Sequence, residues 1–118
     1  MIDKVTEFNL LYDFYSHLLT EKQRDVLRLY HLEDCSLSEI AEAMSISRQG
    51  VHDTLKNAEK SLFEYERKLS LVKSFSETED ALKDADRQID CLISENVGNS
   101  DLTDKLHCLK KTIDGLGL

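Results

Sequence analysis

The stretch that constrains the fold most is residues 36–56, SLSEIAEAMSISRQGVHDTLK. Ile40 and Met44 lie four residues apart, which is the spacing of one helix face, and Ala41 is small enough to let a second helix approach closely. Apolar residues return at helical spacing after a short polar break. The stretch therefore predicts two helices joined by a tight turn, a helix-turn-helix.

The turn and the second helix follow from residue types. Ser45 is a short polar residue that tolerates unusual backbone angles, Ile46 fills the corner between the helices, and Ser47 can cap the next helix. Val51 and Leu55 then point inward. The polar side chains on the outside or flank of this second helix are the candidate nucleic-acid-binding residues. They are Ser47, Arg48, Gln49, His52, Asp53, Lys56 and Lys60.

Length and composition favour one compact core with an appendage, since the chain has 118 residues of which 41% are hydrophobic. We expect a helix-turn-helix domain over residues 1–75 and a helical appendage over residues 76–118 that packs or oligomerises. No run approaches the roughly 20 apolar residues that a membrane span needs. The N-terminus lacks the basic start and apolar run of a signal peptide, so we expect a cytoplasmic protein without membrane insertion.

Candidate catalytic and metal-binding groups are poorly arranged. The cysteines at 35, 91 and 108 are odd in number and widely spaced, which fits reduced thiols better than disulfides or a metal site. The four glycines lie singly, so no glycine-rich phosphate loop is present. His107 and Cys108 are neighbours, and neighbours on a helix diverge by about 100°. We therefore expect neither an enzyme nor a bound cofactor.

Most nucleic-acid-binding proteins carry a basic surface, whereas the formal net charge of this chain is −8. Residues 1–70 hold 9 Lys and Arg against 13 Asp and Glu, and residues 71–118 hold 6 against 10, so each part carries −4. Any affinity for nucleic acid must therefore come from a local patch.

Nearly the whole chain is expected to be helical, since it contains no proline and serine and threonine caps mark the helix starts. A first helix over residues 3–17 carries Phe8, Tyr12, Tyr15 and Leu19 as an amphipathic stripe. Three capping boxes then predict three further helix starts. They are Thr20 with Gln23, Ser36 with Glu39, and Ser76 with Glu79.

No breaker appears between Ser47 and Ser74, which predicts one helix of about 27 residues, roughly 40 Å long. Its inward residues alternate spacings of four and three, a heptad seam. The seam comprises Val51, Leu55, Ala58, Leu62, Tyr65, Leu69 and Val72. Burial of its far half against later helices of the same chain and burial against a second copy are equally compatible with this pattern.

Two amphipathic helices are expected after residue 76. The first carries Leu82, Ala85, Ile89 and Leu92 on one face. The last is capped by Ser100, and its apolar residues are Leu102, Leu106, Leu109 and Ile113. Their charged faces are typical of solvated surface, with partner binding as the alternative.

Residues 20–69, which include TEKQRDVLRLYHLEDCSLSEIAEAMSISRQGVHDTLKNAEKSL, resemble the promoter-reading helix-turn-helix region of sigma factors, region 4. A closer resemblance spans residues 6–75, on LLYDFYSHLLTEKQR, SLSEIAEAMSISRQGVHD and YERKLSL, and is to the YlxM-like helix-turn-helix proteins. That family is linked through gene neighbourhood with the signal recognition particle. The resemblance implies a regulatory or accessory part in that protein-targeting pathway.

Two functions follow as hypotheses. In the first, the chain is a regulator that binds DNA or RNA, with Arg48 suited to guanine, Gln49 to adenine and Asp53 to cytosine N4. One domain would bind weakly, and a homodimer with two reading helices would reach useful affinity at a two-fold site. In the alternative, the chain is a protein-protein interaction module that binds signal recognition particle components.

Overall fold

The computed structural model describes residues 4–116, which form helices and no strand. The chain divides into two compact units, Met1–Val72 and Lys73–Leu118. The α-helices of the described residues, in chain order, are α1 (Lys4–Tyr15), α2 (Glu21–Leu27), α3 (Leu37–Met44), α4 (Arg48–Leu69), α5 (Leu71–Glu95) and α6 (Ser100–Asp114). A 3₁₀ turn, Ser16–Leu18, follows α1, and a π-helical turn, Arg28–Leu32, follows α2. The all-α prediction is confirmed.

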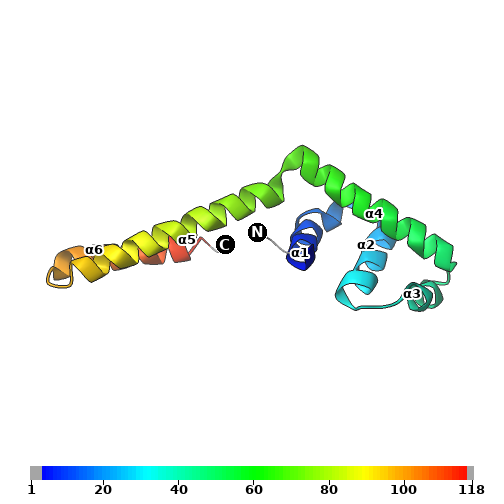
Figure 1. Ribbon diagram of the computed structural model, residues 1–118, viewed down its shortest axis with the longest axis horizontal. Coiled ribbons are helices and arrows are strands. Elements are labelled where there is room, and N and C mark those ends of the chain that lie inside the picture. The colour runs from blue at the N-terminus through cyan, green and yellow to red at the C-terminus, as the bar shows by residue number, and fades with distance from the viewer. Residues whose placement is uncertain (1–3, 117–118) are drawn as a thin grey trace. The chain divides into compact units, whose positions relative to one another are not determined.

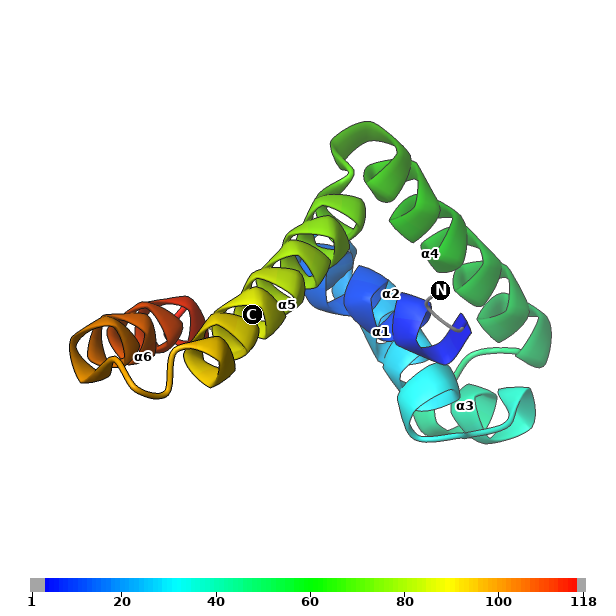
Figure 2. The ribbon, with the colours of Figure 1, turned by 60° about the vertical axis from the view of Figure 1, so that its left-hand side comes forward.

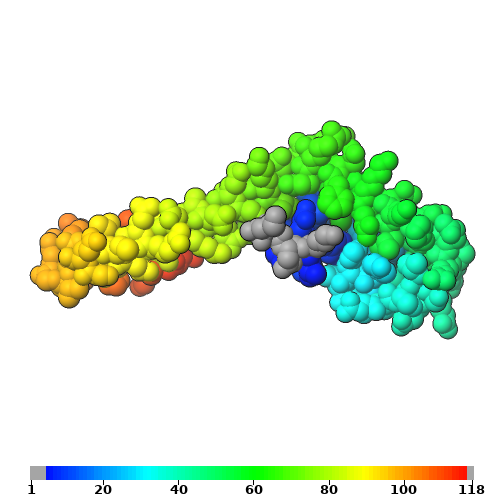
Figure 3. All heavy atoms as spheres, in the orientation of Figure 1, coloured from blue at the N-terminus to red at the C-terminus, as the bar shows by residue number. Residues whose placement is uncertain are grey.

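The first unit is organised around α4, which packs against α1, α2 and α3 (Figures 1 and 2). In the space-filling view the atoms of α2 and α3 lie directly against those of α4 (Figure 3). The buried residues form one cluster, made of Leu11, Tyr15, Leu19, Val26, Leu27, Ile40, Val51, Leu55, Ala58, Leu62 and Val72. The predicted seam is therefore buried inside its own unit from Val51 to Leu62, against helices that precede α4 in the chain.

The predicted first helix, residues 3–17, is shorter in the structure. Its start at Asp3 lies outside the described residues, and its regular part ends at Tyr15. A 3₁₀ turn follows, and Leu19 is extended at φ −91° and ψ 161° because Thr20 already caps the next helix. Of the predicted stripe, Tyr15 and Leu19 are buried, while Phe8 and Tyr12 pack against the core from its edge.

The prediction of one helix over residues 47–74 is wrong at its far end. The helix α4 ends at Leu69, and Ser70 takes a left-handed conformation with φ 54° and ψ 32°. Leu69, expected to point inward, is 51% exposed. A short serine accepts positive φ at a modest cost, and α5 starts directly after it.

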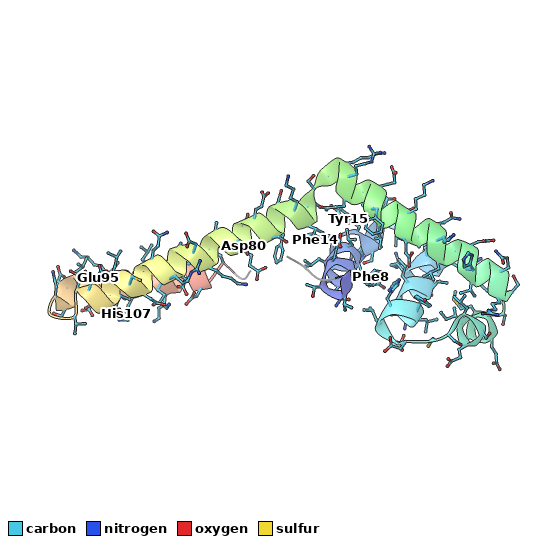
Figure 4. All side chains as sticks on the ribbon, in the orientation of Figure 1. Phe8, Phe14, Tyr15, Asp80, Glu95 and His107 are labelled. Atoms are coloured by element: carbon cyan, nitrogen blue, oxygen red, sulfur yellow. The ribbon has the colours of Figure 1, made fainter. Side chains whose placement is uncertain are left out.

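A polar cluster at the end of α4 explains the break. The hydroxyl of Tyr15 donates to Glu66 Oε1 at 2.6 Å and accepts the backbone N–H of Leu71 at 3.0 Å. Glu66 Oε1 also accepts the N–H of Val72 at 3.0 Å. These bonds satisfy N–H groups that the first turn of a helix leaves without partners, so a new helix begins there. Tyr15 lies where α1 ends, beneath α4 (Figure 4).

Two predicted caps in the second half are also wrong. Ser76 and Glu79 lie inside α5, which is continuous from Leu71 to Glu95 and therefore needs no cap there. The last helix is capped by Asn99, whose Oδ1 accepts the N–H of Leu102 at 3.1 Å, and Ser100 is its first residue.

The second unit is a hairpin in which α6 returns along α5 (Figures 1 and 2). Lys110 Nζ joins the two helices, lying 3.1 Å from Asp86 Oδ1 and 2.8 Å from Asp90 Oδ1. These bonds to Asp90 and Asp86 raise the pKa of Lys110. Ile89 and Leu106 are buried, whereas Leu92 and Leu109, which the sequence grouped with them as apolar residues of the two helices, are 45% and 49% exposed.

None of the helices between residues 4 and 116 combines the length and the apolar character that crossing a membrane requires.

Candidate nucleic-acid interface

The first helix of the motif, α3, begins with the predicted capping box. The N–H of Glu39 donates to Ser36 Oγ and the N–H of Ser36 donates to Glu39 Oε1, both at 3.1 Å. The Ser36 N–H and then the Ser36 hydroxyl hold the pKa of Glu39 below its ordinary value, because the charged carboxylate accepts their hydrogen bonds. Ile40 is fully buried beneath the helix. The box fixes the start of α3 and so the position of the turn that follows.

The turn between the two helices has the predicted conformation. Ser45 is left-handed, with φ 56° and ψ 41°, and Ile46 packs against the edge of the core. The N–H of Ile46 donates to the carbonyl of Ala41 at 3.1 Å, which ties the turn back to α3. A short polar residue followed by an apolar one therefore gives the sharp corner of a helix-turn-helix.

The start of α4 depends on a glycine that the sequence analysis did not use. Ser47 Oγ accepts the N–H of Gly50 at 2.9 Å, as expected for a helix cap. A Cβ added to Gly50 would lie 3.1 Å from that oxygen, a tight contact. Glycine at this position therefore leaves the cap undisturbed. The signal available in the sequence was its place three residues after a capping serine.

The outer side of α4 carries most of the candidate reading residues. Arg48, Gln49, Asp53, Lys56 and Lys60 are exposed, while Val51 and Leu55 on the opposite side are buried. At about 100° per residue, the four from Gln49 to Lys60 fall on one stripe, with Arg48 on its flank. Three cations and one carboxylate thus share the outer side of one helix.

Two side chains of this stripe bind each other. Gln49 Nε2 donates to Asp53 Oδ1 at 2.9 Å, one turn along the helix. The bond leaves the Gln49 carbonyl oxygen and one N–H for a ligand, and it occupies one acceptor position of the Asp53 carboxylate. Sequence spacing placed both residues on the outside but did not predict this pairing.

His52 occupies a different environment from the rest of the set. It is half-buried, and its Nδ1 is buried without a hydrogen bond among residues 4–116, lying 3.6 Å from Asp53 Oδ1. Together with Leu37, Arg48 and Gln49 it lines a hollow between α3 and α4. The structure therefore brings Arg48, Gln49 and His52 together at the turn.

Lys60 lies farther along the helix, 12 residues or about 18 Å from Arg48. It lines another hollow with Asn57, Ser61, Glu64 and Tyr65. Glu39 and Glu42 are exposed on α3, the helix that precedes the turn. The positive charge of the candidate interface is therefore local and lies next to acidic groups.

Comparison with known proteins agrees with this geometry. Residues 2–103 match the UPF0122 family, described as "Putative helix-turn-helix protein, YlxM / p13 like". A UPF0122 protein of Halalkalibacterium halodurans is 48% identical over 90 residues, which cover 76% of this chain and 83% of that protein. A UPF0122 protein of Bacillus cereus strain AH187 is 52% identical over 77 residues, 65% of this chain and 70% of the relative. The predicted family resemblance is confirmed, and the chain belongs to the UPF0122 family of YlxM/p13-like helix-turn-helix proteins.

Proposed function

We propose that the chain is a regulatory protein that binds DNA or RNA with the outer side of the first four turns of α4. The observation that carries this proposal is the division of one helix into two sides. Arg48, Gln49, Lys56 and Lys60 are exposed, while the opposite side is anchored in the core. In helix-turn-helix proteins the second helix enters the major groove and contacts base edges with its N-terminal residues.

The chemistry of the side chains assigns their roles. Arg48, at the first turn, offers paired donors suited to the O6 and N7 atoms of guanine. Gln49, held by Asp53, presents its carbonyl oxygen and remaining N–H to a base edge. Lys56 and Lys60 are suited to phosphates, as is the Ser47 hydroxyl, which still has a proton to donate.

The expected affinity of one chain is low. With about three phosphate contacts the slope of log affinity against log salt is about −3, so affinity falls about 50-fold between 50 and 200 mM salt. A homodimer that presents two copies of α4 to a two-fold site doubles this slope and raises the affinity. We therefore include a homodimer in the proposed function.

The test truncates exposed side chains on the outer side of α4 and leaves its buried side chains unchanged. The variant Arg48→Ala/Gln49→Ala/Lys56→Ala is expected to abolish the gel shift of nucleic acid and to retain its helical circular dichroism. Arg67→Ala/Lys68→Ala, in the last turn of the same helix, also removes two positive charges and is expected to bind as the wild type does. Unchanged binding by the triple variant would reject this surface.

A second candidate function has support from the charge. A net charge of −8 and the acidic groups beside the turn oppose nucleic acid and favour a basic protein partner. Under this alternative the chain binds signal recognition particle components, the pathway implied by the family resemblance. Truncation at Ser74 is then expected to end capture of purified particle components. If the shortened chain still captures them, the appendage is not the binding element.

A further inference from the structure

A groove on the first unit lies between α1, the π-helical turn and α4, about three turns along α4 from Ser47. We call it the α1–α4 groove. Its volume is about 320 Å³, within the range of grooves that bind small ligands or a few side chains of a partner. None of the residues to which the proposed function assigns a nucleic-acid contact lines it, so it is a separate feature of the same unit.

The floor of the α1–α4 groove is apolar. Leu11 and Leu62, which are 2% and 1% exposed, belong to the core beneath it. Phe8 of α1 and Phe63 of α4 also line the groove, and the ring of Phe63 is 56% exposed. An exposed aromatic ring beside a hollow with an apolar floor is the arrangement found in binding grooves, because a ligand there removes apolar surface from water.

The π-helical turn Arg28–Leu32 helps to form the groove. Such turns are rare and occur frequently at functional sites. This one carries His31, whose ring stacks on Phe8 with centroids 4.0 Å apart and whose Nε2 lies 2.7 Å from Glu59 Oε1. His31 therefore contacts both α1 and α4, and the groove between these helices is formed before any ligand binds.

The charged groups that line the α1–α4 groove favour a cationic ligand. Glu7 of α1 is exposed, and Glu59 of α4 binds His31 through one oxygen and keeps the other for a further donor. No lysine or arginine is among the described residues that line the groove. Lys60, next to Glu59 in the sequence, lines a different hollow of α4. Two carboxylates beside an apolar floor attract a basic ligand and repel the phosphates of nucleic acid.

We propose that the α1–α4 groove docks a basic amphipathic helix of a partner protein. The partner helix places a bulky apolar side chain against Phe63 and a lysine or arginine, one turn away, against Glu7 and Glu59. A helix suits the groove because its residues three or four apart share one face, and grooves of this kind take amphipathic helices. Residues 4–116 contain no strand whose edge an extended peptide could join. The proposal does not depend on nucleic-acid binding by the outer side of α4.

Three synthetic peptides labelled with fluorescein serve as probes of the full-length chain. Each has about 15 residues, a length at which a helix can form. The first carries leucines three and four residues apart with lysines elsewhere, the second replaces the lysines with glutamates, and the third replaces the leucines with alanines. Fluorescence anisotropy is expected to show that the leucine–lysine peptide binds at least about tenfold more tightly than either of the others. Equal binding by the alanine–lysine or the leucine–glutamate peptide would overturn the proposal.

One substitution on α4 locates the binding site. Phe63→Ala is expected to weaken binding of the leucine–lysine peptide about tenfold and to retain helical circular dichroism, because the ring is 56% exposed. Leu69→Ala, at a 51% exposed position of the same helix outside the groove, is the matched control and is expected to bind as the wild type does. If Phe63→Ala binds the peptide as tightly as the wild type, the peptide binds elsewhere and the proposal is wrong.

A charge reversal on α1 tests the carboxylates. Glu7→Lys is expected to weaken the leucine–lysine peptide and to strengthen the leucine–glutamate peptide, each by about threefold, the size of an exposed ion pair. Asp13→Lys makes the same charge change at an exposed position of α1 outside the groove and is expected to shift both affinities less. Equal shifts in the two variants would overturn the proposal. All these variants keep Arg48, Gln49 and Lys56, so a failure here leaves the proposed nucleic-acid binding to its own gel-shift test.

Discussion

The two units differ in how their apolar residues are used. In the first unit, helices from four parts of the chain converge, and residues such as Tyr15, Ile40 and Val51 are completely buried. Among the described residues of the hairpin, Ile89 and Leu106 are buried, and leucines of similar size are about half exposed. Both units contain amphipathic helices, α3 and α4 in the first and α5 and α6 in the second, so amphipathicity alone does not decide whether a segment has a core.

What decides it is the number of apolar faces that meet. Three helices surround the inner side of α4, and each contributes a face to one cluster. Two antiparallel helices can shield only the line where they touch, so the remaining apolar surface faces solvent or a partner. The first unit is therefore expected to be stable by itself, and the hairpin is expected to depend on association.

The largest expected effect comes from making the same leucine-to-alanine substitution in each of the two units. Leu62→Ala, at a position 1% exposed, is expected to lower the free energy of unfolding by about 2–5 kcal/mol, because it removes buried methyl groups and leaves a cavity. Leu92→Ala deletes the same atoms from a position 45% exposed. In dilute protein it is expected to cost about 1 kcal/mol or less. Urea unfolding followed by circular dichroism measures both.

Chain concentration sharpens this comparison. The cost of Leu92→Ala is expected to grow as the chain concentration rises, because the predicted oligomerisation of the appendage would then bury this leucine, whereas the cost of Leu62→Ala stays constant. Equal costs at every concentration would show that the hairpin is as self-sufficient as the first unit.

A smaller effect is expected where the first unit ends. Tyr15→Phe removes the hydroxyl that binds Glu66 and the N–H of Leu71, and it is expected to cost about 1–3 kcal/mol because part-buried polar groups lose a partner. Tyr12→Phe, at a half-buried position of the same helix, is the matched control and is expected to cost less. If the two substitutions cost the same, the polar cluster does not hold the start of α5.

The pH dependence of the same variant has a definite sign. Burial of Tyr15, and then its hydrogen bond to Glu66, raise the pKa of its phenol above the ordinary value of 10.0. The native state therefore favours the protonated phenol. Its contribution to stability is complete below pH 10 and is lost as pH rises through the native pKa. The stability difference between wild type and Tyr15→Phe is expected to shrink in alkali.

The parts of the fold that the sequence predicted are those set by local chemistry. Two capping boxes, Thr20 with Gln23 and Ser36 with Glu39, are formed in the structure. The left-handed Ser45 follows equally from residue type and neighbours. The outer side of α4 follows from helical period, so the exposure of Arg48, Gln49 and Lys56 was predictable as well.

The parts that were not predictable depend on contacts between distant residues. The break at Ser70 is made by Tyr15, whose hydroxyl binds the N–H of Leu71 from 56 residues earlier in the chain, and no spacing rule detects such a contact. Once α5 starts at Leu71, the pattern of Ser76 with Glu79 falls inside a helix and has no free N–H group to cap. In the candidate site, the bond from Gln49 to Asp53 and the buried Nδ1 of His52 were missed for a related reason. Helical period gives the side of a residue but not its rotamer.

The smallest expected effect concerns the capping box that positions the candidate interface. The N–H and hydroxyl of Ser36 lower the pKa of Glu39, so the native state favours its carboxylate. This contribution to stability is present above the ordinary pKa of 4.5 and is lost as pH falls through the native pKa. Glu39→Gln keeps an acceptor but loses the charge, and it is expected to lower the melting temperature slightly at pH 7 and not at all in acid. Glu42→Gln, at the other end of α3, removes the same charge and is not expected to destabilise, since a negative charge near a helix C-terminus opposes the dipole. Identical melting of Glu39→Gln and wild type at pH 7 would show that Ser36 alone positions the helix before the turn.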